Sequence, residues 1–229
     1  MRLRLFFLGV LACLAAGCGS SGTATTTVTT TTTGTTTAPS TMALTVFEVD
    51  NGLLRPRITK VPRTPAVAGA ALAALGINTS LSIGDGTATV ALDRATQDEQ
   101  AEIVYTLTQF PTVKRVDVAG RKGLTRDDFA RYVPPILIES PAAGAEVSSP
   151  FRVSGTASVF EATLVVQLVR DGKVVAKRTV TASEGAPGRG SFETTLRATP
   201  GEATVSAFAP SAADGSPQHQ VDVEVTVVP

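Results

Sequence analysis

Apolar and polar residues alternate through residues 160–183, on both sides of the Asp171-Gly172 pair. Alternation sends successive side chains to opposite faces of a strand, and Asp-Gly is a favoured two-residue turn, so this stretch predicts a β-hairpin. Its inward-facing side chains are predicted to be Phe160, Leu164, Val166 and Leu168. The exposed tip, with Asp171 and Lys173, is a candidate partner contact, and an ordinary hairpin turn is the simpler interpretation.

The same character continues through the second half of the chain. About seven short apolar runs between residues 136 and 228 are separated by Gly, Pro and Asp-Gly turns, which is typical of an immunoglobulin-like sandwich. Pro134 and Pro135 disfavour a helix before them and cannot donate to a strand ladder. We therefore expect an all-β immunoglobulin-like domain over residues 134–229.

Residues 43–133 mix strand and helix periodicities. Strands are predicted over residues 43–49, 55–62, 81–93 (a pair around a Gly-Asp-Gly turn) and 112–120. Helices are predicted over residues 64–76 and 96–110. The resulting order β-β-α-β-β-α-β predicts a small α+β sandwich with its helices on one face of a sheet.

The predicted helices carry recognisable end signals. Thr64 is placed as the N-cap of the first helix, and Gly76 follows its last turn. Thr96 and Glu99 have the spacing of a capping box at the start of the second helix. The acidic pairs at 98–99 and 127–128 are interpreted as charges at helix starts, where they favour the helix dipole.

The first residues of the chain have the pattern of an export signal. Arg2 and Arg4 precede an apolar run that is too short to span a bilayer, and small residues lead into Cys18. This arrangement resembles the lipobox of bacterial lipoproteins, which implies removal of residues 1–17 and lipidation of Cys18. Cys13 fits the same pattern but would leave a very short signal. An ordinary secretory signal and an uncleaved anchor are the alternatives.

Residues 18–42 are dominated by Thr and contain few large apolar side chains. Such a segment buries too little surface to offset the entropy of ordering its backbone, so we expect a disordered tether. With Cys18 lipidated, the tether would hold the domains outside the cytoplasm on the cell membrane. Thr-rich stalks of this kind favour a high-GC Gram-positive bacterium, with or without sugars attached.

Composition argues against most chemistry. The chain has 20 basic and 20 acidic residues, and loss of Arg2 and Arg4 with the signal leaves no charge excess for nucleic acid. His219 is the one His, near the start of the last predicted strand, where a solvated side chain is the simpler interpretation than a general base. Acidic residues followed by Gly are typical of turns, so we expect no metal site. With no other candidate catalytic group in the sequence, we also expect no cofactor and no enzyme activity.

Sugar sites commonly use an aromatic face, and the chain has two Tyr and no Trp. Tyr105 lies at core spacing in the second predicted helix. Tyr132, beside Arg131, is the better candidate for an exposed partner contact, and a residue at the domain junction is the simpler interpretation.

Both predicted domains resemble known families. Residues 43–120 resemble the GerM-type (GerMN) domain of sporulation and germination lipoproteins, in "TVFEVDNGLLRPRITKVP", "GDGTATVALD" and "AEIVYTLTQFPTVKRVDV", although this copy is shorter before "GTATV". Residues 136–228 resemble the immunoglobulin-like domain of bacterial spore germination proteins, in "FRVSGTASVFEATLVVQLVRDGKVVA" and "GSFETTL". Relatives carry a Cys pair in the loop that reads "SEGAPGRG" here, so we expect this loop to be freer.

These resemblances imply a noncatalytic envelope module for interaction or assembly, with a link to sporulation or germination. GerM-type folds resemble ring-building modules of secretion systems, which implies envelope proteins or further copies of the chain as partners. The alternative is a lipoprotein that binds cell-wall glycan (peptidoglycan) or a solute. An aromatic-lined groove between the domains would favour that alternative, and a closed junction would favour the scaffold.

Overall fold

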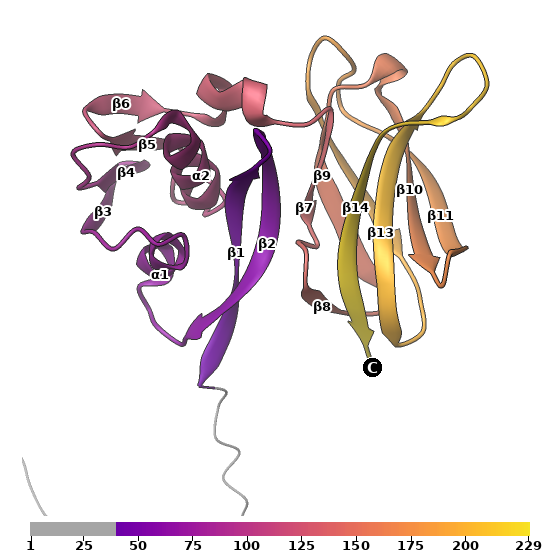
Figure 1. Cartoon of the computed structure of the whole chain (residues 1–229), viewed down its shortest axis with the longest axis horizontal. Helices are drawn as coiled ribbons and strands as arrows, with labels where there is room; N and C mark the ends of the chain where they lie inside the picture. Colours follow the sequence, from indigo (N-terminus) through magenta and orange to yellow (C-terminus); the bar gives the residue numbers. More distant parts are fainter. Residues whose placement is uncertain (1–39) are drawn as a thin grey trace, which may run out of the picture. The chain divides into compact units, whose positions relative to one another are not determined.

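The computed structural model describes residues 40–229 (Figure 1). The signal, Cys18 and all but the last residues of the predicted tether lie outside the described residues. Within the described part, no helix has the length and apolar character needed to cross a membrane.

The first domain begins with a hairpin of β1 (Thr41–Asp50) and β2 (Leu53–Pro62). The turn falls on Asn51 and Gly52, whose φ angles of 52° and 78° suit the tight turn that was predicted there. Side chains of β1 are buried on both faces: Val46 packs with Ala71, whereas Phe47 packs with Tyr105.

The remaining strands of this domain form a separate four-stranded sheet in the order β3-β4-β5-β6. The strands are β3 (Leu81–Gly84), β4 (Thr87–Val90), β5 (Arg115–Val118) and β6 (Arg121–Leu124). β4 and β5 are parallel, and the chain crosses between them through α2 (Gln97–Leu107). In Figure 1, α2 lies between this sheet and the β1–β2 hairpin. Its buried Ile103, Val104 and Leu107 belong to the same core as strand residues of the sheet.

Two features correct the expectation of one sheet covered by helices. The hairpin pairs with no other strand of the described chain, so the domain has two sheets with α2 between them. The strand at β5 is followed by β6, which was not predicted, and by a 3₁₀ segment, η1 (Arg126–Tyr132), whose first turn holds the acidic pair 127–128 that was interpreted as a helix start. β6 buries one residue in four, so it carries no alternation that a sequence pattern could reveal.

The two helices begin differently. Thr96 and Glu99 form the predicted capping box of α2: the Glu99 N–H donates to Thr96 Oγ1 (3.2 Å), and the Thr96 N–H donates to Glu99 Oε2 (2.7 Å). The predicted cap of the first helix is wrong, because α1 runs from Val67 to Ala74. Thr64 Oγ1 instead accepts from the N–H of Ala66 (3.1 Å), which makes a local turn before the helix.

The second domain is the predicted all-β sandwich. Its five-stranded sheet has the order β11-β10-β13-β14-β8, and its three-stranded sheet has the order β12-β9-β7. The strands are β7 (Ile136–Ser140), β8 (Ala145–Ser148), β9 (Phe151–Ala157), β10 (Thr163–Arg170), β11 (Lys173–Thr181), β12 (Gly190–Leu196), β13 (Gly201–Pro210) and β14 (Pro217–Val228). β8, which was not predicted, pairs in parallel with β14. One core fills the space between the sheets.

The hairpin of residues 160–183 is partly as predicted. Leu164, Val166 and Leu168 on β10 are fully buried. Phe160 was predicted to face inward and is instead 70% exposed. It begins η2 (Phe160–Ala162), where φ angles of 53° and 55° at Glu161 and Ala162 interrupt the extended backbone before β10 starts. The hairpin also lies at one side of the sandwich, because β11 is an edge strand.

Candidate functional site

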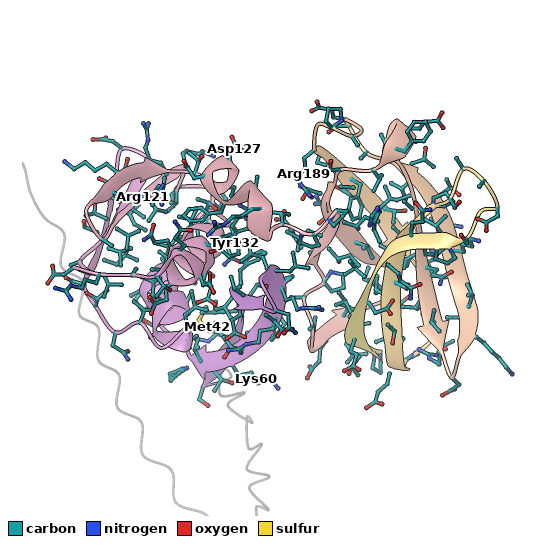
Figure 2. The ribbon with its side chains drawn as sticks, turned by 45° about the horizontal axis from the view of Figure 1, so that its top comes forward. Met42, Lys60, Arg121, Asp127, Tyr132 and Arg189 are labelled. Carbon is teal, nitrogen blue, oxygen red and sulfur yellow. The ribbon has the colours of Figure 1, made fainter. Side chains whose placement is uncertain are left out.

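Tyr132, the candidate for an exposed contact, is buried, so it does not present an exposed aromatic face. Only 5% of it is exposed, and its ring packs against Phe129 with centroids 6.3 Å apart. Its hydroxyl donates to Asp98 Oδ1 at the start of α2 (2.6 Å). Burial, with the hydrogen bond to Asp98, raises the pKa of Tyr132. The 3₁₀ segment η1 places Tyr132 against α2 (Figure 2). A sequence pattern does not reveal that η1 folds back on an earlier helix.

Arg131, the neighbouring candidate, is exposed, but its guanidinium is bonded to residues around Tyr132. Its guanidinium lies 4.7 Å from the centroid of the Tyr132 ring and donates to the Tyr132 hydroxyl (2.7 Å). It also bonds to Gln97 on α2. The Tyr132–Arg131 pair therefore ties η1 to the helix start instead of presenting an aromatic face.

Asp171 and Lys173 form the exposed tip of the β10–β11 hairpin, as predicted. Positive φ angles at Asp171 (49°) and Gly172 (71°) make this a tight hairpin turn. The sequence interpretation missed the next two residues: Val174 and Val175 are 53% and 50% exposed. The sequence contains a sign of this exposure, because two adjacent Val residues interrupt the alternation of apolar and polar residues in this strand.

The two domains are joined by backbone hydrogen bonds. The Ile58 N–H on β2 donates to the Ala143 carbonyl (2.9 Å), and the Ala143 N–H donates to the Pro56 carbonyl (3.3 Å). Leu137 on β7 is buried in the core that holds Phe47 and Tyr105 of the first domain. The junction therefore shares apolar packing with the first domain as well as main-chain pairing.

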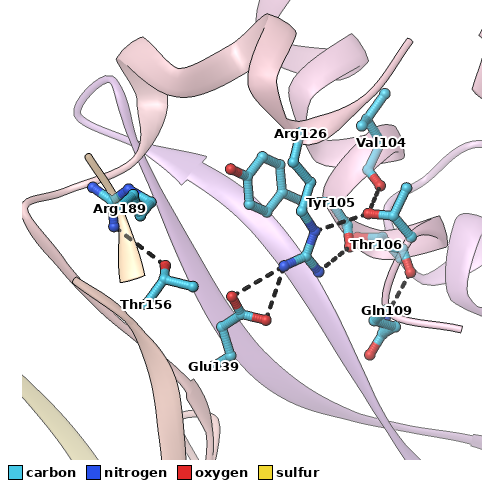
Figure 3. Close-up of polar contacts among 9 residues, drawn as sticks. Val104, Tyr105, Thr106, Gln109, Arg126, Glu139, Thr156 and Arg189 are labelled. Carbon is cyan, nitrogen blue, oxygen red and sulfur yellow. Dashed lines mark hydrogen bonds and ion pairs between the residues drawn. The ribbon is translucent and has the colours of Figure 1, made fainter. Parts of the chain in front are cut away.

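Arg126 is the central side chain of this junction (Figure 3). Its Nη1 bonds to both carboxylate oxygens of Glu139 on β7 (3.0 and 2.9 Å), and its Nε donates to Thr108 Oγ1 (2.9 Å). The guanidinium also lies 4.7 Å from the centroid of the Tyr105 ring. Burial raises the pKa of Tyr105 to about 12, against the opposing effect of the Arg126 charge. One cation thus connects η1, α2 and the second domain.

Arg189 adds a further tie from the loop that was expected to be freer. Its Nη2 donates to the Pro134 carbonyl between the domains (2.7 Å), and its Nη1 donates to Thr156 Oγ1 on β9 (3.2 Å). Desolvation lowers the pKa of this guanidinium. The loop is also held by a hydrogen bond from the Ala186 N–H to the Val159 carbonyl (2.9 Å). Hydrogen bonds therefore hold this loop in place.

A groove of about 450 Å³ runs beside the junction. It is bordered by β2 on one side and by β7 and β14 on the other, with Leu54, Pro56, Pro135, Leu137 and Val221 in its wall. His219 lies at this groove with a φ of 56°. Its lining combines aliphatic and Pro residues with Arg55, Gln220 and Asp222, and it contains no Phe, Tyr or Trp, so it does not match the aromatic lining expected of a sugar site. Among residues 40–229, no three potential metal ligands cluster together.

A second groove, of about 610 Å³, lies within the first domain and was not predicted. The start of α1, strand β3 and the loop after α2 form it. Its apolar lining includes Pro65, Val67, Leu81, Ile83, Phe110 and Pro111. Ile83 is 43% exposed on β3, which is an edge strand of its sheet.

The fold and these surfaces define a two-domain protein whose second domain is an immunoglobulin-like β-sandwich. More particularly, residues 135–216 match the family described as the immunoglobulin-like domain of bacterial spore germination. The match covers the second domain from β7 to β13, and β14 continues the sandwich beyond the matched residues.

Several solved structures have parts similar to this chain. The tandem GerMN domains of the sporulation protein GerM from Bacillus subtilis are 15% identical, with 69% of this chain and 61% of that chain covered and a TM-score of 0.32. Fibronectin(III)-like modules of Clostridium thermocellum CbhA are 17% identical, covering 40% and 94%, with a TM-score of 0.28. An engineered protein is 22% identical, covering 59% and 29%, with a TM-score of 0.30.

The chain thus spans less than a third of the length of that engineered protein and less than two thirds of GerM. TM-scores of this size assign neither a fold nor a function to this protein. No curated protein matches the chain in sequence.

Proposed function

We propose that this protein is a noncatalytic, lipid-anchored module of the cell envelope that takes part in interaction or assembly, with a link to sporulation or germination. The family match of residues 135–216 supports the link to germination. The resemblance of residues 43–120 to GerM-type domains supports the assembly role. The export signal and Cys18 support the anchor.

The observation that carries the proposal is where the exposed apolar side chains lie. The large hydrophobic residues exposed within the described chain are Ile83, Phe160, Val174 and Val175. Ile83 is on the edge strand β3, and the two Val residues are on the edge strand β11. Edge strands with apolar side chains are natural sites for a partner strand or segment. These positions therefore suit contacts with other proteins.

The junction supports the same role, because it would present both domains to a partner as one body. Arg126 and the β2 backbone each bond across it, and Arg189 holds the Pro134 carbonyl at the start of the second domain. The groove beside the junction favours a second candidate function, the binding of a solute or a cell-wall glycan. Its lining has no Phe, Tyr or Trp on which a sugar ring could stack, and its aliphatic residues together with Arg55 and Asp222 suit a small solute that has both apolar and charged groups.

An affinity pull-down from chemically crosslinked envelopes tests this function, with the tagged full chain and Cys18→Ala as the mislocalised control. We expect recovery of one defined protein partner, or of the chain in a discrete oligomer, with loss of both in the control. Recovery of glycan fragments alone would contradict the assembly role and favour the second candidate.

A further inference from the structure

Phe160 is an aromatic side chain that the fold holds in solvent. It is 70% exposed, although Val159 before it and Ala162 after it are 3% and 8% exposed. Glu161 and Ala162 both adopt left-handed φ angles, of 53° and 55°. Such angles in non-Gly residues cost energy and persist where the surrounding structure enforces them. The backbone strain is what directs Phe160 away from the core.

The surroundings of this turn are tightly fixed. The Ala182 N–H donates to the Ala162 carbonyl (2.8 Å), and the Ala186 N–H donates to the Val159 carbonyl (2.9 Å). A Cβ added to Gly185 would lie 2.8 Å from the Ala162 nitrogen, so the two segments are in close backbone contact. Phe160 is therefore presented on a rigid support, and a rigid aromatic side chain loses little entropy on binding.

The first domain offers a recess of matching chemistry. The groove between α1, β3 and the loop at Phe110 has a volume of about 610 Å³ and an apolar lining. Ile83 in its wall is 43% exposed, so the groove also leaves a large apolar side chain in solvent. Filling this groove with a ring would bury apolar surface on both sides.

We propose that Phe160 of one copy inserts into the groove between α1 and β3 of a second copy. Projection and recess lie on different domains, so the contact is heterologous and repeats from copy to copy as an open, head-to-tail chain. This inference rests on the proposed assembly function and names its partner as the protein itself.

The charges around the two surfaces are complementary. The hydrogen-bonded segments 157–165 and 182–189 contain Glu161 and Glu184, which are both exposed, and Arg189, whose guanidinium is bonded to Pro134 and Thr156. Around the groove, segments 65–69, 79–86 and 110–115 contain Lys114 and Arg115 against a single acidic residue, Asp85. The Lys114 side chain lies beside Gly86 (Cγ 3.5 Å from the position of a Cβ), in the turn between β3 and β4. An anionic membrane surface would repel the two Glu residues, so charge favours the second copy.

Photocrosslinking in the full chain tests the contact. The full chain is produced with p-benzoylphenylalanine in place of Phe160, and the membranes of the producing cells are irradiated. Crosslinked peptides are then identified by mass spectrometry. We expect a dimer whose crosslinks map to residues 65–83 or 110–112. Ile83→Glu should reduce the yield about tenfold or more, because it places a charge where the ring would be buried. The same photoreactive residue at Val174, which is also exposed (53%), is the control and should not give this crosslink.

Charge reversal provides a second, independent readout. Glu161→Lys and Lys114→Glu should each lower the crosslink yield a few-fold, and combining the two reversals in one chain should restore it. Both residues are exposed, so neither change is expected to disturb folding.

Each alternative outcome overturns the inference in a different way. Crosslinks from Phe160 to another envelope protein would retain the proposed assembly function but exclude self-insertion. Crosslinks from Phe160 to lipid alone would show that this side chain is not the contact. The same conclusion would follow if Phe160 gave no photocrosslink while chemical crosslinkers still captured an oligomer. Absence of any protein partner by both methods would remove the proposed function as well.

Discussion

Two buried hydroxyl groups show how much a single hydrogen bond matters in this protein. Thr106 Oγ1 on α2 accepts from the Phe47 N–H (2.9 Å), whereas Ser206 Oγ on β13 is buried with no protein partner. We expect Thr106→Val to lower the free energy of unfolding by about 1–3 kcal/mol, because it leaves a buried N–H unpaired. Ser206→Ala should leave this free energy unchanged or raise it by about 1 kcal/mol. Urea unfolding of both variants checks the difference, and equal losses would contradict it.

Tyr105 makes stability depend on pH in the alkaline range. Its pKa is about 12 in the folded protein, against an ordinary value of 10.0. Below pH 10 the phenol is protonated in both states. Between pH 10 and 12 the unfolded chain loses the proton while the folded chain keeps it, so stability falls with rising pH, by up to about 2–3 kcal/mol.

Comparison with Tyr105→Phe isolates this effect, since Phe cannot ionise and retains the ring. The difference in unfolding free energy between the two proteins should be constant from pH 7 to 9.5 and then shift in favour of the variant. A difference that stays constant up to pH 11.5 would exclude a raised pKa at this position.

At the scale of the element, the start of α2 depends on a reciprocal cap that α1 lacks. We expect Thr96→Ala to lower the free energy of unfolding by about 0.5–2 kcal/mol, because Thr96 Oγ1 accepts from the Glu99 N–H. Thr64→Ala is the matched control, since its hydroxyl lies in a turn before α1 and should cost less than about 0.5 kcal/mol. Thermal unfolding of both variants tests this order, and a larger loss at Thr64 would contradict it.

At the scale of the whole molecule, the ion pair between Arg126 and Glu139 connects the domains. Both side chains are about three quarters buried, with 27% and 24% exposed. We expect Glu139→Gln to lower the free energy of unfolding by about 1.5–3 kcal/mol and to separate a single calorimetric transition into two, because Arg126 loses its charged partner.

The pair of Arg152 and Glu193 is the matched control, because its side chains are 64% and 55% exposed on the second domain alone. Glu193→Gln should change stability by less than about 0.5 kcal/mol and leave the shape of the transition unaltered. Similar calorimetric traces for Glu139→Gln and Glu193→Gln would show that the domains are not coupled through Arg126.

Local features of this protein were determined by the sequence alone. The Asn51-Gly52 and Asp171-Gly172 turns and the capping box at Thr96 follow from interactions within a few residues. The sandwich of the second domain was also predictable, because alternation and turn spacing suffice to indicate strands. These features need no knowledge of what packs against them.

Tertiary structure decided the rest, because strand order and burial depend on contacts far apart in the sequence. Tyr132 is buried because η1 folds back on α2, and Phe160 is exposed because two strained residues turn it out of the strand pattern. Neither the residue type nor the position in the sequence pattern distinguishes Tyr132 and Phe160 from aromatic residues with the opposite exposure. The hydrogen bonds of Arg126 to Glu139 and the groove beside Ile83 likewise arise only when separate elements meet.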